Sequence, residues 1–443
     1  MGKSMKNKFL VLAVVLTLVT SLVIAGCVPA PTPVTPPVTP PPVTPPVTPP
    51  VEPVEPPEPL VIGASLAMTG LYAMYMADIV SIMPVYADYI NAQGGIHGRP
   101  VEFIMYDNES TVELAATQTA KLIEEDECHV VISSLFTTII WPQYEAAKGT
   151  GVPFIIMVGG PEPPEFYIPG SNIFGVHHPY DYFGHATAVY MFEDLGCTKF
   201  AYLSTDDASG EEDLAWMLES AEELGIEVAI IEYCGPDAID VTAQLTRIKA
   251  KVDAGEADAL QLAGSGIVVG PMWKGIKLLG LDEQIPVACA TGMVAIETIG
   301  LVTGYELETL IMPMMPMQAG GLPVLSADHP LMVEVDEMWA VWSDKFGETR
   351  GTREEFGMGW ACFGWDTMEM AVEGLKQADP DLLLEDLATA REAVRWSLEN
   401  EMDYMTSWGW RTTSPTDHIG IPKAVFCLIT IKNDQFELLK LLE

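Results

Sequence analysis

The chain has 443 residues, too many for one average domain, and 49% of them are hydrophobic, enough for large cores. It carries 22 Lys and Arg against 62 Asp and Glu, a formal net charge of −40. This charge argues against nucleic-acid binding and against docking on an anionic lipid surface, because both are held by Lys and Arg. The acidic residues are most simply explained as a solvated exterior.

The first 26 residues have the layout of an export signal. Lysines precede an apolar run that starts at Phe9 and ends in LVIAGC at Cys27. A positive start, an apolar stretch and small residues are typical of a secretory signal, and the last six residues resemble a bacterial lipobox. We therefore predict a signal peptide over 1–26 and a lipid anchor at Cys27. The alternative is a plain transmembrane anchor with a chance cysteine.

Residues 27–59 form a repeated tract of Pro, Val and Thr. Proline has a fixed φ and no amide hydrogen, so such a tract favours an extended polyproline II rod over a packed domain. We predict a stalk that holds the rest of the chain away from a membrane.

From Leu60 onward, apolar strands alternate with amphipathic helices in two series of similar size. In the first series we predict strands at 60–67, 101–107, 129–134 and 153–160, and helices at 76–90, 110–126 and around Tyr144. In the second series we predict strands at 199–205, 227–234, 258–264, 286–291 and 309–316, and helices that end near 195, 224, 252 and 279. Three helices, at 331–346, 356–375 and 381–398, and a strand at 424–431 complete the chain. This order predicts an α/β fold of two doubly wound lobes with parallel sheets.

Two helices of these series carry a Ser-x-x-Glu pattern at their predicted starts, Ser110 to Glu113 and Ser209 to Glu212. In a capping box, the serine hydroxyl and the glutamate carboxylate satisfy free amides of the first turn. We predict that both serines cap their helices.

The segment NAQGGIHGRPVEF, from Asn91 to Phe103, has three glycines and a histidine. A phosphate-binding loop follows a strand and opens a helix, whereas here a helix precedes the glycines and a strand follows them. Glycine is the usual residue at a helix carboxyl end, which repels anions. His97 has no second His or Cys at ligand spacing. We predict a connection that binds neither phosphate nor metal.

Six cysteines follow Cys27, without a Cys-x-x-Cys pair. Their apolar, strand-like surroundings predict buried free thiols, and disulfides are the alternative for an exported protein. They are Cys128, Cys197, Cys234, Cys289, Cys362 and Cys427.

The stretch INAQGGIHGRPVEFIMYDNES, after IGASLAMTGLYAMY, resembles the amino-terminal signature of the type I periplasmic-binding-fold family, the solute receptors of branched-chain-amino-acid-type ABC transporters. The similarity continues through QTAKLIEED, GVPFI and FGWDTMEMAVEGLKQA, and spans Leu60 to Leu442. It implies two Rossmann-like lobes joined by three crossovers, with the ligand in the cleft at the carboxyl ends of the strands. The lobes would comprise 60–176 with 316–410, and 177–315 with 411–443.

The resemblance also implies ligand contacts. Tyr75 matches a tyrosine that reaches the ligand, with Tyr72 beside it, and Thr137 and Thr138 match hydroxyl residues that hold a ligand carboxylate. Helix capping is the alternative role for these hydroxyls. The remaining cleft positions of this kind are Ser134, Leu135, Phe136, Gly159, Gly160, Tyr180, Tyr182, Ser265 and Thr291.

Three of these positions depart from amino-acid-binding members. Gly159 and Gly160 offer amides but no hydroxyl, Ser265 stands where an aromatic residue is expected, and Thr291 stands where an acid pairs with the ligand ammonium. Burying an ammonium without a counter-charge is costly. We therefore expect an apolar or aromatic carboxylate or amide rather than a standard α-amino acid.

Weaker alternatives concern the same cleft. Tyr180 and Tyr182 are expected to stack on the ligand, whereas Asp181 and His185 lack a third residue for a metal site. An amine held by Glu162 or Glu165 is less favoured than a solvated loop. We expect neither metal nor cofactor.

The sequence thus predicts an extracytoplasmic, lipid-anchored and monomeric receptor that passes a solute to an ABC permease and its ATPase. A sensory module of the same fold is the first alternative. A surface enzyme is disfavoured because the chain has no G-x-S-x-G, H-E-x-x-H or Walker pattern.

Overall fold

The computed structural model describes residues 57–157, 163–176, 181–264, 268–289, 307–317, 324–346, 359–421, 425–432 and 435–442. The predicted signal peptide, Cys27 and nearly all of the stalk therefore lie outside the described residues. No helix within those ranges is both long and apolar enough to cross a membrane.

The first lobe is built on a five-stranded sheet in the order β2-β1-β3-β4-β5, in which every neighbouring pair is parallel. Its strands are β1 (Leu60–Leu66), β2 (Val101–Asp107), β3 (Val130–Ile132), β4 (Phe154–Ile156) and β5 (Ile173–Gly175). Its helices are α2 (Ala73–Ala92), α3 (Val112–Glu124), α4 (Thr137–Ala147), α10 (Met332–Phe346), α12 (Ala361–Gln377) and α13 (Leu387–Asn400), with the short η1 (Pro164–Tyr167) and η6 (Leu382–Leu384).

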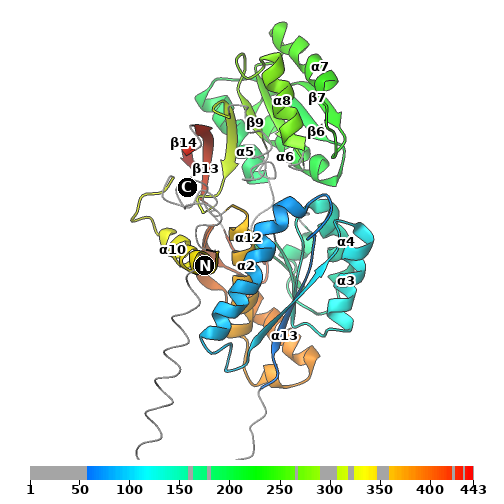
Figure 1. Cartoon of the computed structure of the whole chain (residues 1–443), viewed down its shortest axis with the longest axis vertical. Coiled ribbons are helices and arrows are strands. Elements are labelled where there is room, and N and C mark those ends of the chain that lie inside the picture. Colours follow the sequence, from blue (N-terminus) through cyan, green and yellow to red (C-terminus); the bar gives the residue numbers. More distant parts are fainter. Residues whose placement is uncertain are drawn as a thin grey trace, which may run out of the picture. The chain divides into compact units, whose positions relative to one another are not determined.

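Helices cover both faces of this sheet because apolar side chains alternate along the strands (Figure 1). Ile132 and Ile155 pack toward α2 and α12, whereas Val131, Phe154 and Ile156 pack toward α3 and α4. The doubly wound arrangement predicted from the alternating elements is confirmed for this lobe.

The second lobe has a seven-stranded sheet in the order β14-β13-β10-β9-β8-β6-β7. Its strands are β6 (Lys199–Thr205), β7 (Glu227–Cys234), β8 (Ala259–Ala263), β9 (Val287–Cys289), β10 (Leu310–Met314), β13 (Phe426–Lys432) and β14 (Gln435–Leu442). Its helices are α5 (Asp181–Val189) with the π-helical turn η2 (Tyr190–Asp194), α6 (Ala208–Leu224), α7 (Thr242–Asp253) and α8 (Val269–Leu279).

The two faces of this sheet are again covered by different helices. Phe200 and Tyr202 pack with α6, and Ala201 and Leu203 share a cluster with side chains of α7 and α8. Strands β13 and β14 are antiparallel additions to an otherwise parallel sheet, and β14 was not among the predicted strands.

The chain passes between the lobes three times: after β5, after β10 and before β13. A small hairpin, β11 (Asp403–Thr406) with β12 (Gly409–Thr412), precedes the third passage. Arg411 on β12 is fully buried and donates to the carbonyl oxygens of Gly175, Val176 and Ile419. This arginine fastens the third passage to the end of β5, so residues around 411–419 are attached to the first lobe.

The glycine-rich segment after α2 is a tight connection to β2, as the sequence predicts. Gly95 has φ of +73°, and a Cβ there would lie 2.0 Å from the carbonyl oxygen of Arg99. Only glycine fits this approach without a shift of the backbone. His97 is exposed in the turn.

Both predicted capping boxes are wrong. Thr111 is the N-cap of α3, and the Ser110 hydroxyl donates instead to the carbonyl oxygen of Thr69. Asp207 caps α6, through a hydrogen bond from the amide of Gly210 to its carboxylate (3.1 Å). Serine and aspartate are similar as caps, and in α6 the aspartate, two residues before Ser209, takes the role.

All six cysteines of the body are buried, as predicted, and free.

Candidate functional site

The carboxyl ends of β1 and β3 bring three predicted residues together in an aromatic cluster. Tyr72 is the N-cap of α2, Tyr75 lies in its first turn, and Phe136 is in the turn between β3 and α4. The rings of Tyr72 and Phe136 stack at 4.5 Å, and Tyr75 meets Phe136 edge-on at 5.4 Å. Trp360, which sequence reasoning missed, extends the cluster with its ring 6.1 Å from that of Tyr75.

The turn that carries Phe136 is strained. Its φ is +68°, a conformation that costs a side-chain-bearing residue on the order of 1–3 kcal/mol. Strain of this kind persists where the surrounding structure fixes a functional turn. No side chain caps the amino terminus of α4, so its first-turn amides and the hydroxyls of Thr137 and Thr138 are grouped at the end of β3.

Two other predicted residues hold this turn in place rather than line an opening. The Ser134 hydroxyl accepts a hydrogen bond from the amide of Ala67 (3.1 Å), and the Ser134 amide donates to Gln143 (2.8 Å). Leu135 is completely buried in the core. These contacts fix the end of β3 against the end of β1.

The amino-terminal half of α6 in the second lobe faces this turn. The Thr137 hydroxyl donates to the carboxylate of Glu212, 2.5 Å away, so residues of the two lobes touch here. Burial raises the pKa of Tyr72, and the negative charge of Asp207 raises it further. Acidic groups of α6 therefore confront an aromatic and hydroxyl surface on the first lobe.

Asp213, in the second turn of α6, is 6% exposed. One carboxylate oxygen accepts a hydrogen bond from the amide of Gly264 at the end of β8 (2.9 Å). Burial raises the pKa of Asp213 to about 7, although the hydrogen bond from Gly264 lowers it, and the negative charge of Asp207 adds to the rise. Neither Asp207 nor Asp213 forms an ion pair with any Lys, Arg or His in the described part of the chain.

Ser209 lies one turn before Asp213 on the same helix face. It is 6% exposed, and its hydroxyl has no hydrogen-bond partner among the residues that the structure describes. The second oxygen of Asp207 is likewise buried without one. Because Asp207 caps the helix, the Ser209 hydroxyl remains available.

Several predicted residues cannot be placed. Gly159, Gly160, Tyr180, Ser265 and Thr291 lie outside the described residues, and Tyr182 falls in α5 with its side chain also outside them.

Sequence reasoning gave no role to Asp207 and Asp213. The available signal was that Asp207 comes just after the predicted strand at 199–205 and that Asp213 lies in the helix that follows, because ligands of open α/β sheets bind at strand carboxyl ends.

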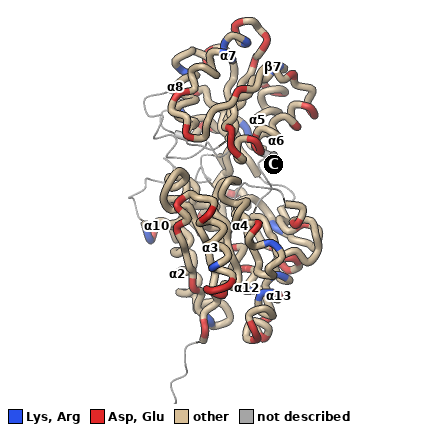
Figure 2. The backbone as a smooth tube through the Cα atoms, turned by 90° about the vertical axis from the view of Figure 1, so that its right-hand side faces the viewer, with Lys and Arg blue, Asp and Glu red and all other residues tan. Residues whose placement is uncertain are grey.

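The acidic residues do not form a metal site. Among the described residues, no group of three or more His, Cys, Asp and Glu is arranged to hold a metal ion. His185 instead contacts Ser220 and Glu223. Figure 2 shows Asp and Glu spread over the described chain, α6 included, with few Lys and Arg between them.

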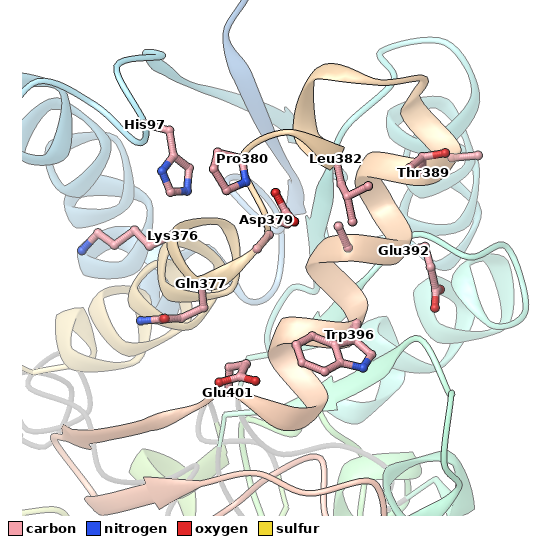
Figure 3. Close-up of a pocket in the computed structure, with 13 residues that line it drawn as sticks. His97, Lys376, Gln377, Asp379, Pro380, Leu382, Thr389, Glu392, Trp396 and Glu401 are labelled. Carbon is pink, nitrogen blue, oxygen red and sulfur yellow. The ribbon is translucent and has the colours of Figure 1, made fainter.

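A separate pocket of about 1030 Å³ lies in the first lobe between the end of α12 and α13. Figure 3 shows His97, Lys376 and Trp396 around it, each from a different element. The charged residues there are largely paired within the lobe: Lys376 with Glu373 (2.7 Å) and Glu392 with Arg395 (2.8 Å). This pocket offers no unpaired buried charge of the kind found on α6.

Comparison with known proteins supports the fold. Residues 59–430 match a family model described as periplasmic binding protein. An amino acid binding protein of Pseudomonas aeruginosa is 22% identical over 226 residues, which cover 51% of this chain and 59% of that protein. The match thus spans less than two-thirds of that relative.

Two solved structures show the same fold at low identity. The branched-chain amino acid transporter substrate binding protein LivJ of Streptococcus pneumoniae, in complex with isoleucine, gives a TM-score of 0.69 at 19% identity, over 86% of this chain and 100% of that one. A solute binding protein of an ABC transporter from Rhodopseudomonas palustris, in complex with benzoate, gives 0.67 at 18% identity, over 86% and 96%.

Proposed function

Because the chain belongs to the periplasmic binding protein family, we propose that it is an extracytoplasmic receptor that binds a small solute between its lobes and delivers it to an ABC permease and its ATPase. The observation that carries this proposal is the meeting of strand carboxyl ends from both lobes, where the Thr137 hydroxyl contacts Glu212. Closure of the lobes around the ligand is the working motion.

The anchoring part of the proposal comes from the amino terminus. The lipobox-like end of the apolar run and the proline tract after it suit a receptor tethered through Cys27. The tether would keep the receptor beside its permease, and the receptor is proposed to act as a monomer.

The apolar side of the ligand is suggested by Tyr72, Tyr75 and Phe136, whose rings cluster at the end of β1 and β3. A carboxylate or amide on an apolar or aromatic body, rather than a standard α-amino acid, remains the prediction from sequence. The benzoate and isoleucine complexes of the two similar structures mark the two sides of that choice.

Thermal unfolding tests the proposal. The full chain, purified in mild detergent, would be heated with leucine and phenylalanine, with their deaminated acids and amides, and with their decarboxylated amines. A ligand at about a thousandfold over its dissociation constant stabilises by roughly 4 kcal/mol, a clear rise in Tm. Uptake of that ligand into vesicles that contain the permease separates delivery from a purely sensory role, which would show binding without uptake.

A further inference from the structure

The amino-terminal half of α6 holds acceptors that the protein itself does not use. Ser209 and Asp213 are four residues apart and share one helix face. Both are 6% exposed. The Ser209 hydroxyl and one oxygen of Asp207 are buried without a hydrogen-bond partner among the described residues. Buried polar groups are nearly always paired, so unpaired ones so close together on one helix indicate a missing partner.

The missing partner is positively charged. Asp213 is buried without an ion pair in the described chain, and the one hydrogen bond that it accepts from a described residue comes from the amide of Gly264. A buried carboxylate needs a cation or further donors to offset the loss of its hydration. Because the described residues form no metal-holding group, an organic ammonium with its three donors suits these acceptors better than a metal ion.

A carboxylate on the ligand is disfavoured in the same place. The Thr137 hydroxyl, expected from the family resemblance to hold a ligand carboxylate, donates to Glu212 instead. A ligand carboxylate there would face Glu212 and Asp207 in a site where like charges repel strongly. On the opposite side, the stacked rings of Tyr72 and Phe136 offer an apolar wall.

We infer that Asp213, with Asp207 and Ser209, binds the protonated amine of a solute that has an apolar or aromatic body and no carboxylate. This inference rests on the proposed receptor function of the interlobe site, and it replaces the carboxylate or amide expected from the sequence with an amine. The counter-charge would come from α6 rather than from the neighbourhood of Thr291, the position at which the family resemblance implies an acid.

Titration calorimetry on the full chain in detergent tests this with four matched probes: 2-phenylethylamine, 3-phenylpropanamide, 3-phenylpropionate and phenylalanine. We expect the amine to bind tightest. Asp213→Asn preserves the size of the side chain and its ability to accept from Gly264, and it should weaken the amine by roughly thirtyfold or more. Ser209→Ala should weaken it by roughly three- to tenfold.

Glu219→Gln is the matched control, because it removes one charge from an exposed position on the same helix. It should leave amine binding unchanged. Circular dichroism and Tm establish that each variant folds. If Asp213→Asn does not fold, Ser209→Ala still tests the inference.

The outcomes separate the two proposals. Tighter binding of 3-phenylpropionate or the amide, or equal losses in Asp213→Asn and Glu219→Gln, would overturn the amine inference and leave the receptor function intact. If no amine binds, the inference fails. The receptor function is then decided by native mass spectrometry of the chain purified from its expression host, in which a co-purified small solute supports it.

Discussion

Replacing Asp213 by Asn should stabilise the ligand-free protein, most strongly at alkaline pH. In the folded state burial raises the pKa of this carboxyl to about 7, against an ordinary value of 3.8. A folded-state pKa above the unfolded value means that the folded protein binds the proton more tightly. The contribution of this carboxyl to the stability of the fold is therefore fully present below pH 3.8 and is lost as the pH rises through 7.

The size of this effect follows from the two pKa values. A difference of about 3 pKa units corresponds to roughly 4 kcal/mol of lost stability once both states are ionised. At pH 5.5 the loss is roughly 2 kcal/mol, so the advantage of Asp213→Asn should grow by roughly 2 kcal/mol between pH 5.5 and pH 8.5. Among the described residues, Asp207 carries a negative charge that repels the Asp213 carboxylate, and removing the Asp213 charge relieves this repulsion.

Urea unfolding of the full chain and of the variant, at both pH values and without ligand, measures this difference. Glu219→Gln again serves as the control, and its stability relative to the parent should not follow the same rise. A free-energy difference between Asp213→Asn and the parent that stays flat, or shrinks toward pH 8.5, would refute the reasoning. It would mean that Asp213 is solvated or paired in the folded protein.

Three further predictions concern the first lobe. Gly98→Ala should cost about 1 kcal/mol of stability for its positive φ, whereas Gly95→Ala should cost at least about twice that, because its new Cβ would collide with a backbone carbonyl. The urea midpoints of the two variants measure these losses, and equal losses would contradict the close approach at Gly95. Arg411→Met should destabilise by roughly 3 kcal/mol or more in the same assay, since three buried carbonyls lose their donor, and a smaller loss would mean that water replaces the guanidinium. Burial and neighbouring acids hold the pKa of Glu369 well above its usual range, so Glu369→Gln should raise the urea midpoint more at pH 8 than at pH 5; the opposite trend would refute it.

The fold was predictable because its signals are local and repeated. Apolar strands such as 101–107 and 199–205 are separated by amphipathic helices of ordinary length, and this alternation fixes parallel sheets with two covered faces. The strands that escaped prediction have weaker signals. β5 has only three residues, and β14 is an antiparallel edge strand, most of which is only partly buried.

Only the part of the candidate site that lies on the first lobe was predicted from the sequence. Family resemblance pointed to Tyr72, Tyr75 and Phe136, and the structure brings these rings together. The pattern at Ser209 predicted a helix cap, and the neighbouring acids Asp207 and Asp213 were therefore given no role. Which of two neighbouring capping residues is used depends on where the strand ends, and the sequence does not specify that to within two residues.

The two halves differ in how the residues contribute to stability. The rings of the first lobe gain from burial whether or not ligand is present, whereas Asp213 is a liability until a cation arrives. A ligand that pairs with this carboxylate lowers its pKa and recovers the stability that burial removes, so binding and folding free energies are linked through one side chain. Asp213→Asn should thus be more stable than the parent without ligand, and the parent loaded with 2-phenylethylamine should regain most of that difference. A buried carboxylate that lowers stability until a ligand binds is expected at a binding site, whereas a purely structural helix gains nothing from it.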